Sequence, residues 1–343
     1  MDPTEEDIKQ LEEALAANPT DTNLMNKLAL GYLVNPDLLQ DNEDVKLLEK
    51  VYQTKKTIKS THNLAWFYYC EGCGENSKPE RAIEIQQECI SMNPKSFYPY
   101  RLYGQMLLKN NQPLEAIKYL EIGYSKENCR EIANNLGVLY AQQGDLHSCH
   151  DYFIKATNEK DIEYKSKYNL AITKIQLGET EGALRITEEL KKNIIDGNNG
   201  SDDVDYFEVA YLYYLLNDDD SAYSCCKKCD WNYYDLFSWE YVTYLIYKND
   251  LEVFKKLVAD QIEKEKNWIK ENKDNDEYWE DDTEEEKQQE LAQRESHITR
   301  LRNLEAEFAR NKPNTDVKNQ FLLETCGCLL FDCVRHGNLK DDE

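Results

Sequence analysis

The chain has 343 residues and a formal net charge of −25, because 66 acidic residues outnumber 41 basic ones. Such a charge repels phosphate backbones and anionic lipid, which argues against direct nucleic-acid or membrane binding. With 13 glycines and 8 prolines, and without a run of 18 apolar residues, the sequence resembles neither a turn-rich β protein nor a membrane-spanning one. Its acidic N-terminus has no apolar signal segment, so we expect a cytoplasmic protein.

The first half of the chain repeats itself with a period of 33 to 34 residues. The pair Tyr103-Gly104 recurs as Leu136-Gly137 and then as Leu170-Ala171. Twelve residues after each pair stands a small residue, in turn Ala116, Cys149 and Ala183. The pattern also extends upstream to Leu28-Ala29 and Leu64-Ala65 and downstream to Val209-Ala210 and Tyr241-Val242, with longer loops around 72–78 and 196–203. A fixed period of this length is typical of a stacked array of helical hairpins.

These positions resemble the signature of the tetratricopeptide repeat over about residues 5–258. The resemblance implies an all-α fold, a right-handed superhelical solenoid with an opening half-unit and six or seven helix pairs within residues 1–258. A small residue at the Leu-Gly position allows two helix backbones to approach closely. Each hairpin is amphipathic and buries its apolar face only by stacking on its neighbours.

Beyond residue 258 the period ends. Residues 259–287 predict a charged helix followed by an acidic linker, and residues 288–343 predict a C-terminal helical cap. The cap would consist of a helix up to Phe308, a break at 311–315 and a second, almost wholly apolar helix over 317–334. That second helix would cover the last face of the solenoid or, alternatively, form a homodimer.

No motif for catalysis or for a cofactor is recognisable, and we expect a protein that is not an enzyme and carries no cofactor. Eleven cysteines include the pairs Cys70/Cys73 and Cys226/Cys229, and a C-terminal group. A zinc- or thiol-dependent enzyme built on these clusters is the alternative from a different class, although the pairs lie too far apart in sequence for one tetrahedral site to be evident.

Three asparagines stand directly before the Leu-Gly position of their repeats: Asn63, Asn135 and Asn169. They resemble the asparagine ladder of long tetratricopeptide superhelices, in which carboxamides hold the backbone of an extended peptide in the concave groove. An Asn amide offers both a donor and an acceptor, so it matches a peptide group. The alternative is that these asparagines stabilise repeat packing. Leu102 and Glu208 interrupt the ladder.

Two other stretches are candidate partner surfaces. An aromatic belt between Tyr206 and Tyr247 has residues off the repeat pattern that favour the surface, namely Tyr214, Tyr233 and Tyr234. The strip 274–286 holds nine acidic residues and no basic one. Its candidate residues are Tyr278, Trp279, Glu280, Asp281 and Asp282. The strip would bind a basic partner, or it is a solvated loop.

The sequence therefore favours a non-enzymatic scaffold or adaptor that binds a partner protein or extended peptide of basic character. It would use the groove or the acidic and aromatic C-terminal third. The alternative is a cytosolic immunity protein that neutralises a basic toxin, such as a nuclease, by covering its active site. The acidity itself has a simpler reading, since it also keeps a long helical protein in solution.

Overall fold

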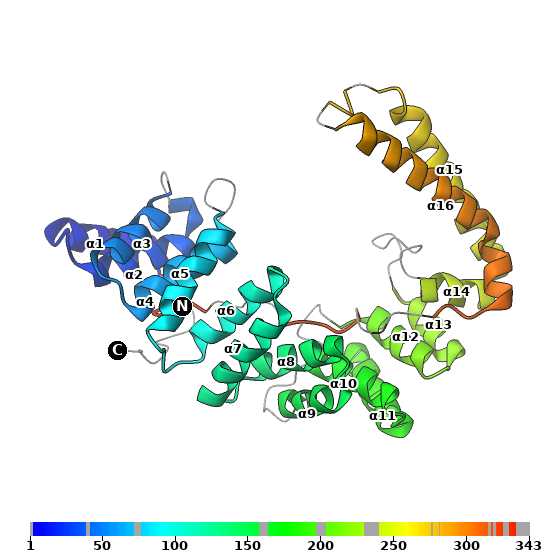
Figure 1. Cartoon of the computed structure of the whole chain (residues 1–343), viewed down its shortest axis with the longest axis horizontal. Coiled ribbons are helices and arrows are strands. Elements are labelled where there is room, and N and C mark those ends of the chain that lie inside the picture. Colours follow the sequence, from blue (N-terminus) through cyan, green and yellow to red (C-terminus); the bar gives the residue numbers. More distant parts are fainter. Residues whose placement is uncertain are drawn as a thin grey trace. The chain divides into compact units, whose positions relative to one another are not determined.

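The structure is a computed structural model that describes residues 3–38, 42–71, 77–157, 164–196, 204–229, 240–275, 277–280, 282–314, 317, 320–324 and 329–333. These described residues form α-helices, with no β-strand among them (Figure 1). The all-α fold expected from the repeat pattern is confirmed.

The helices follow one another along the chain with short connections. In order, they are α1 (Glu5–Ala17), α2 (Thr22–Val34), α3 (Glu43–Thr54), α4 (Ile58–Trp66), α5 (Pro79–Ser91), α6 (Tyr98–Lys109), α7 (Pro113–Lys126), α8 (Arg130–Gln143), α9 (Leu146–Thr157), α10 (Tyr164–Gln176), α11 (Thr180–Ile195), α12 (Tyr206–Leu215), α13 (Asp219–Cys226), α14 (Glu240–Asn249), α15 (Leu251–Asn272) and α16 (Glu284–Arg310). A short 3-10 helix η1 (Pro36–Leu38) follows α2, and a π-helical turn η2 (Phe67–Glu71) extends α4.

Consecutive helices pack as antiparallel pairs. After α1, which packs on α2, the pairs are α2/α3, α4/α5, α6/α7, α8/α9, α10/α11, α12/α13 and α14/α15. The chain divides into two compact units. Unit 1 comprises Met1–Ile162 together with Leu322–Glu343, and unit 2 comprises Glu163–Phe321. The described residues 322–324 and 329–333 therefore pack with the first repeats.

Two glycines show why the helices of a pair lie so close. A Cβ atom on Gly104 would lie 2.5 Å from Leu120, and one on Gly137 would lie 2.5 Å from the Phe153 ring. Both partners are fully buried. The side chain from the second helix thus occupies the space that a larger residue in the first helix would need.

Local capping explains where several helices begin and end. Thr4, Thr57, Asp205 and Thr283 each form a capping box, in which the side chain accepts from a backbone N–H of the first turn. At the other end of α8, Gly144 adopts a φ of 82°, a left-handed conformation that favours glycine. These caps define where helices begin and end, independently of how the helices pack.

The C-terminal cap is not the hairpin that the sequence suggested. α16 packs against α15 instead, where Arg294 lies over the Trp268 ring, 3.6 Å from its centroid, and pairs with Glu265. The expectation of a second helix over 317–334 is wrong for its described residues, because 320–324 and 329–333 contain no helix. The side chains of Leu329, Leu330, Phe331 and Cys333 are buried in unit 1, and side chains of unit 1 form hydrogen bonds to the backbone at residues 322, 324, 329 and 331.

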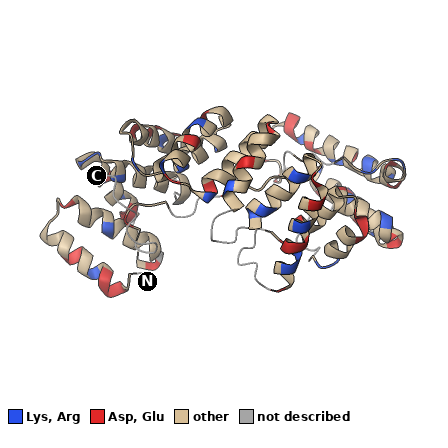
Figure 2. Cartoon of the chain, turned by 90° about the horizontal axis from the view of Figure 1, so that it is seen from below, with Lys and Arg blue, Asp and Glu red and all other residues tan. Residues whose placement is uncertain are grey.

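Acidic and basic residues are interspersed along the helices rather than confined to one helix face (Figure 2). Among the described residues, none of the helices combines the length and the apolar character needed to cross a bilayer.

Candidate peptide-binding face

The candidate site is a surface of unit 1 formed by the first helices of successive pairs, α4, α6 and α8. Six of its residues contact residues 322–324 and 329–333, which we call the tail. This tail-binding face consists of Lys59, His62, Asn63, Gln105, Asn134 and Asn135.

Asn135 holds the tail backbone at Glu324 with both ends of its amide. Its Nδ2 donates to the carbonyl of Glu324 at 3.0 Å, and its Oδ1 accepts from the N–H of Glu324 at 2.8 Å. Next to it, Asn134 donates to the carbonyl of Leu322 at 2.9 Å. On α6, Gln105 donates to the same Glu324 carbonyl at 3.4 Å.

Asn63 repeats this arrangement two helix pairs earlier. Its Oδ1 accepts from the N–H of Phe331 at 2.9 Å, and its Nδ2 donates to the carbonyl of Phe331 at 3.1 Å. The same Nδ2 donates to Oδ1 of Asn26 on α2, also at 3.1 Å, which orients the amide. Both side chains are buried, so the hydrogen bonds form away from water.

His62 also contacts the tail backbone, at a residue between the two that Asn135 and Asn63 hold. Its Nε2 lies 2.9 Å from the carbonyl of Leu329, and its Nδ1 lies 3.1 Å from the side-chain amide of Gln86. A carbonyl only accepts and the amide nitrogen only donates, so the ring is neutral with its proton on Nε2. Burial lowers the pKa of His62 to about 4, although both hydrogen bonds act in the opposite direction.

Four tail side chains enter the core of unit 1. Leu329, Leu330 and Cys333 belong to the same buried cluster as residues of α1 to α6. Phe331 is 1% exposed, and its ring meets those of His62 and Tyr98 edge to face, with centroids 5.1 and 6.2 Å away. The tail is thus held by its backbone and anchored by apolar side chains.

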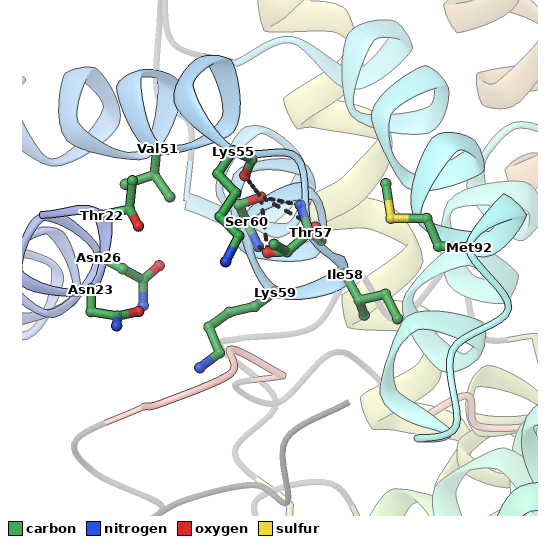
Figure 3. A pocket seen from close by; sticks show the side chains of 10 residues that line it. All are labelled: Thr22, Asn23, Asn26, Val51, Lys55, Thr57, Ile58, Lys59, Ser60 and Met92. Atoms are coloured by element: carbon green, nitrogen blue, oxygen red, sulfur yellow. Dashed lines mark hydrogen bonds between the residues drawn. The ribbon is translucent and has the colours of Figure 1, made fainter. Parts of the chain in front are cut away.

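An ion pair and a cavity lie beside this anchor. Nζ of Lys59 is 2.8 Å from a carboxylate oxygen of Asp332. Figure 3 shows Lys59 extending at the edge of a cavity of about 580 Å³ between α2, α3 and α4. Its walls include Asn26, Lys55 and Ser60. Asn26 is 3% exposed, and its Nδ2 has no hydrogen-bond partner within the described part of the chain.

The other residues that the sequence singled out lie elsewhere. Asn169 is buried on α10 in unit 2, and its ladder role stays a prediction. Tyr214 was expected on the surface, and this is wrong, because it is 3% exposed and donates to the carbonyl of Pro313. Its ring packs against Tyr241 and Tyr244 on α14, which explains why a tyrosine outside the repeat pattern is buried. Tyr233 and Tyr234 lie outside the described residues.

The acidic strip is partly structural. Trp279 is 9% exposed, packs edge to face on Trp268 and donates from Nε1 to the carbonyl of Asn272, so the expectation that it forms a partner surface is wrong. Tyr278 is 49% exposed, and Glu280 and Asp282 are exposed as well. Asp281 lies outside the described residues.

Sequence reasoning missed Lys59, His62 and the tail itself. His62 directly precedes Asn63, so the ladder position of Asn63 could have pointed to His62. The apolar run at 329–331 was visible, but it predicted a helix. Within the described ranges, no group of three or more His, Cys, Asp or Glu side chains is placed to hold a metal ion.

Comparison with known proteins finds solved structures of low sequence identity. No protein-family model matches the sequence, and no curated protein matches it. Among solved structures, YrrB, described as a TPR protein with an unusual peptide-binding site, is 15% identical and has a TM-score of 0.44, with coverage of 63% of this chain and 97% of YrrB. The Pseudomonas aeruginosa protein pilF is 17% identical, with a TM-score of 0.48 and coverage of 70% and 97%. A tetratricopeptide repeat protein from Parabacteroides merdae is 16% identical, with a TM-score of 0.48 and coverage of 60% and 78%. The described helices pair in chain order as helical hairpins, as the repeat pattern of the sequence predicted.

Proposed function

We propose that this tetratricopeptide-type solenoid is a non-enzymatic scaffold that binds a partner protein by holding an extended segment of it on the tail-binding face. One observation carries the proposal. Asn63 and Asn135 each make two hydrogen bonds to a single residue of non-helical backbone, at Phe331 and Glu324. The face is therefore built to pair with the backbone of a chain segment.

Backbone recognition of this kind gives affinity to many sequences, while side-chain pockets give selectivity. The two contacts of Asn63 are buried and the two of Asn135 are partly buried, and such hydrogen bonds contribute roughly 0.5–1.5 kcal/mol each. Loss of both asparagines should therefore weaken a bound segment by about ten-fold or more.

The test is a selection of random peptides on the full chain carrying Phe331→Ala, a change that removes the buried aromatic anchor of the tail. The selected peptides are then measured on the same chain with Asn63→Ala and Asn135→Ala added. We expect at least ten-fold weaker binding. The matched control is Asn303→Ala, because Asn303 is exposed on α16 and bonds only within that helix. Equal binding to the double variant would show that the peptides use another surface.

The turn between α15 and α16 is a second candidate surface, for a basic partner. Glu280, Asp282, Glu284 and Glu285 are exposed there, next to the half-exposed Tyr278. A lysine-rich peptide should bind it at 0.05 M salt and lose affinity at 1 M, where the Debye length is about 3 Å. Salt-independent binding would contradict this surface. An immunity protein for a basic toxin would use the same turn, and no observation favours that alternative.

The homodimer through 317–334 is not part of this proposal. The described apolar residues 329–331 and 333 are buried within their own unit, so they offer no exposed apolar helix to a second copy.

A further inference from the structure

We infer that the partner segment carries the side-chain pattern of the tail, two aliphatic residues followed by an aromatic and an acidic one, and that the tail is a built-in competitor for the same face. This inference rests on the proposed function. The pattern is that of Leu329-Leu330-Phe331-Asp332. Side chains other than the ladder asparagines recognise it.

The two asparagines fix the register of a bound segment. Asn135 pairs with residue 324 and Asn63 with residue 331, so the two fixed points lie 331 − 324 = 7 residues apart. A segment that satisfies both amides places its side chains at set positions relative to α4. The backbone contacts thus fix where each side-chain position lies, and the side chains at 329–332 must fit the pockets at those positions.

The aromatic position is the most selective of these pockets. The Phe331 ring fills a space bounded by His62 and Tyr98 and is among the largest fully buried side chains of the chain. A smaller residue would leave a cavity, and a polar residue would be buried without a partner. His62 also holds the carbonyl of residue 329, so the ring and the backbone are fixed together.

The acidic position follows directly. Lys59, which lines the cavity in Figure 3, pairs with Asp332, and Lys55 contributes a second positive charge to the cavity wall. The buried Nδ2 of Asn26 is a hydrogen-bond donor without a protein partner in the described residues. A carboxylate is the best acceptor for two ammonium groups and an amide N–H, all of which donate, and a basic residue here would be repelled.

Several features make the tail exchangeable. The polypeptide reaches the tail from unit 2, because Phe321 is the last residue of that unit before the tail. Its described residues form neither helix nor strand with unit 1, and its backbone is held by side chains that serve any other backbone equally well. The tether raises the local concentration of the tail, so a free partner competes at a disadvantage until the tail is weakened.

The test uses a fluorescent synthetic peptide of residues 320–335 under reducing conditions, titrated into the full chain and followed by anisotropy. We expect it to bind the Phe331→Ala chain at least ten-fold more tightly than the unaltered chain, whose own tail competes. A peptide with the Phe331→Ala change should bind at least ten-fold more weakly. A peptide with Asp332→Lys should also bind weakly, and Lys59→Glu in the protein should restore its affinity.

Folding of each variant is checked by circular dichroism. If Phe331→Ala unfolds unit 1, the comparison is made in the Asp332→Lys chain, which alters only a half-buried ion pair. Equal affinity for altered and unaltered chains, or no binding to either, would show that the tail is a permanent part of the fold. A dimer formed by exchanged tails would equally overturn the inference. If random peptides of another pattern bind through Asn63 and Asn135, the proposed function stands and this inference fails.

Discussion

Acidification should destabilise unit 1 through His62. The ring accepts from the Gln86 amide on α5, donates to the carbonyl of Leu329 and packs on Phe331. Lys59 on α4 and Asp332 of the tail form an ion pair. Burial lowers the pKa of this ring from 6.5 to about 4. In the unfolded chain the ring takes up a proton near pH 6.5, whereas in the folded chain it stays neutral until about pH 4. The stability associated with the neutral ring is therefore complete above pH 6.5 and is lost as pH falls toward 4.

The size of the effect follows from the two pKa values. Each pKa unit of difference corresponds to about 1.4 kcal/mol once both states have titrated. At pH 5 the unfolded ring is almost fully protonated and the folded ring is mostly neutral, so the loss between pH 7 and pH 5 is about 2 kcal/mol. A change of this size is a large part of the stability of a typical domain.

The assay is urea unfolding followed by far-UV circular dichroism at pH 7 and pH 5, for the natural chain and for His62→Gln. Carboxylates titrate in both proteins, so the informative quantity is the difference between them. We expect the pH-dependent loss to be about 2 kcal/mol smaller in His62→Gln. His147→Gln, at an exposed position on α9, should retain the loss of the natural chain. Identical pH dependence in the natural chain and His62→Gln would refute the neutral, buried ring.

Three further predictions concern packing and caps. Gly137→Ala should destabilise unit 1 by about 1–3 kcal/mol, because its Cβ would overlap the Phe153 ring, whereas Gly182→Ala faces only a flexible lysine chain and should be neutral or slightly stabilising in thermal melts. Arg294→Leu should cost about 1–2 kcal/mol in urea unfolding, because it removes a 2.8 Å contact to the buried Glu265 but is itself partly exposed; no loss would make the pair dispensable. Thr283→Ala should cost about 1 kcal/mol by removing the capping box of α16, and unchanged helicity and stability would contradict that role.

The repeat array was predictable because its spacing is a local property of the chain. A small residue at 104 or 137 and its partner in the next helix lie within one hairpin, so the pattern repeats at a fixed offset. The helix expected over 317–334 was not predictable from local pattern. Its apolar residues are compatible with a buried helix, and only contacts with helices more than 180 residues earlier in the chain select the non-helical form.

The candidate site was likewise predictable only in its local part. The position of Asn63 and Asn135 before the Leu-Gly pair indicated a backbone-binding role from the sequence alone. The role of Lys59 depends on Asp332, and that of His62 on Leu329, so neither had a sequence signal of its own. Tyr214 illustrates the opposite error, since a tyrosine off the repeat pattern is buried by a connection that follows α16.

The central claim is that the asparagine side chains hold a non-helical backbone, and residue-resolved hydrogen exchange of the tail amides tests it most directly. The N–H groups of Glu324 and Phe331 donate to Asn135 and Asn63. We expect both amides to be protected in the natural chain, with Asn135→Ala accelerating exchange mainly at Glu324 and Asn63→Ala mainly at Phe331. Exchange of both amides at the rate of an unstructured peptide, or protection that survives both substitutions, would contradict the claim.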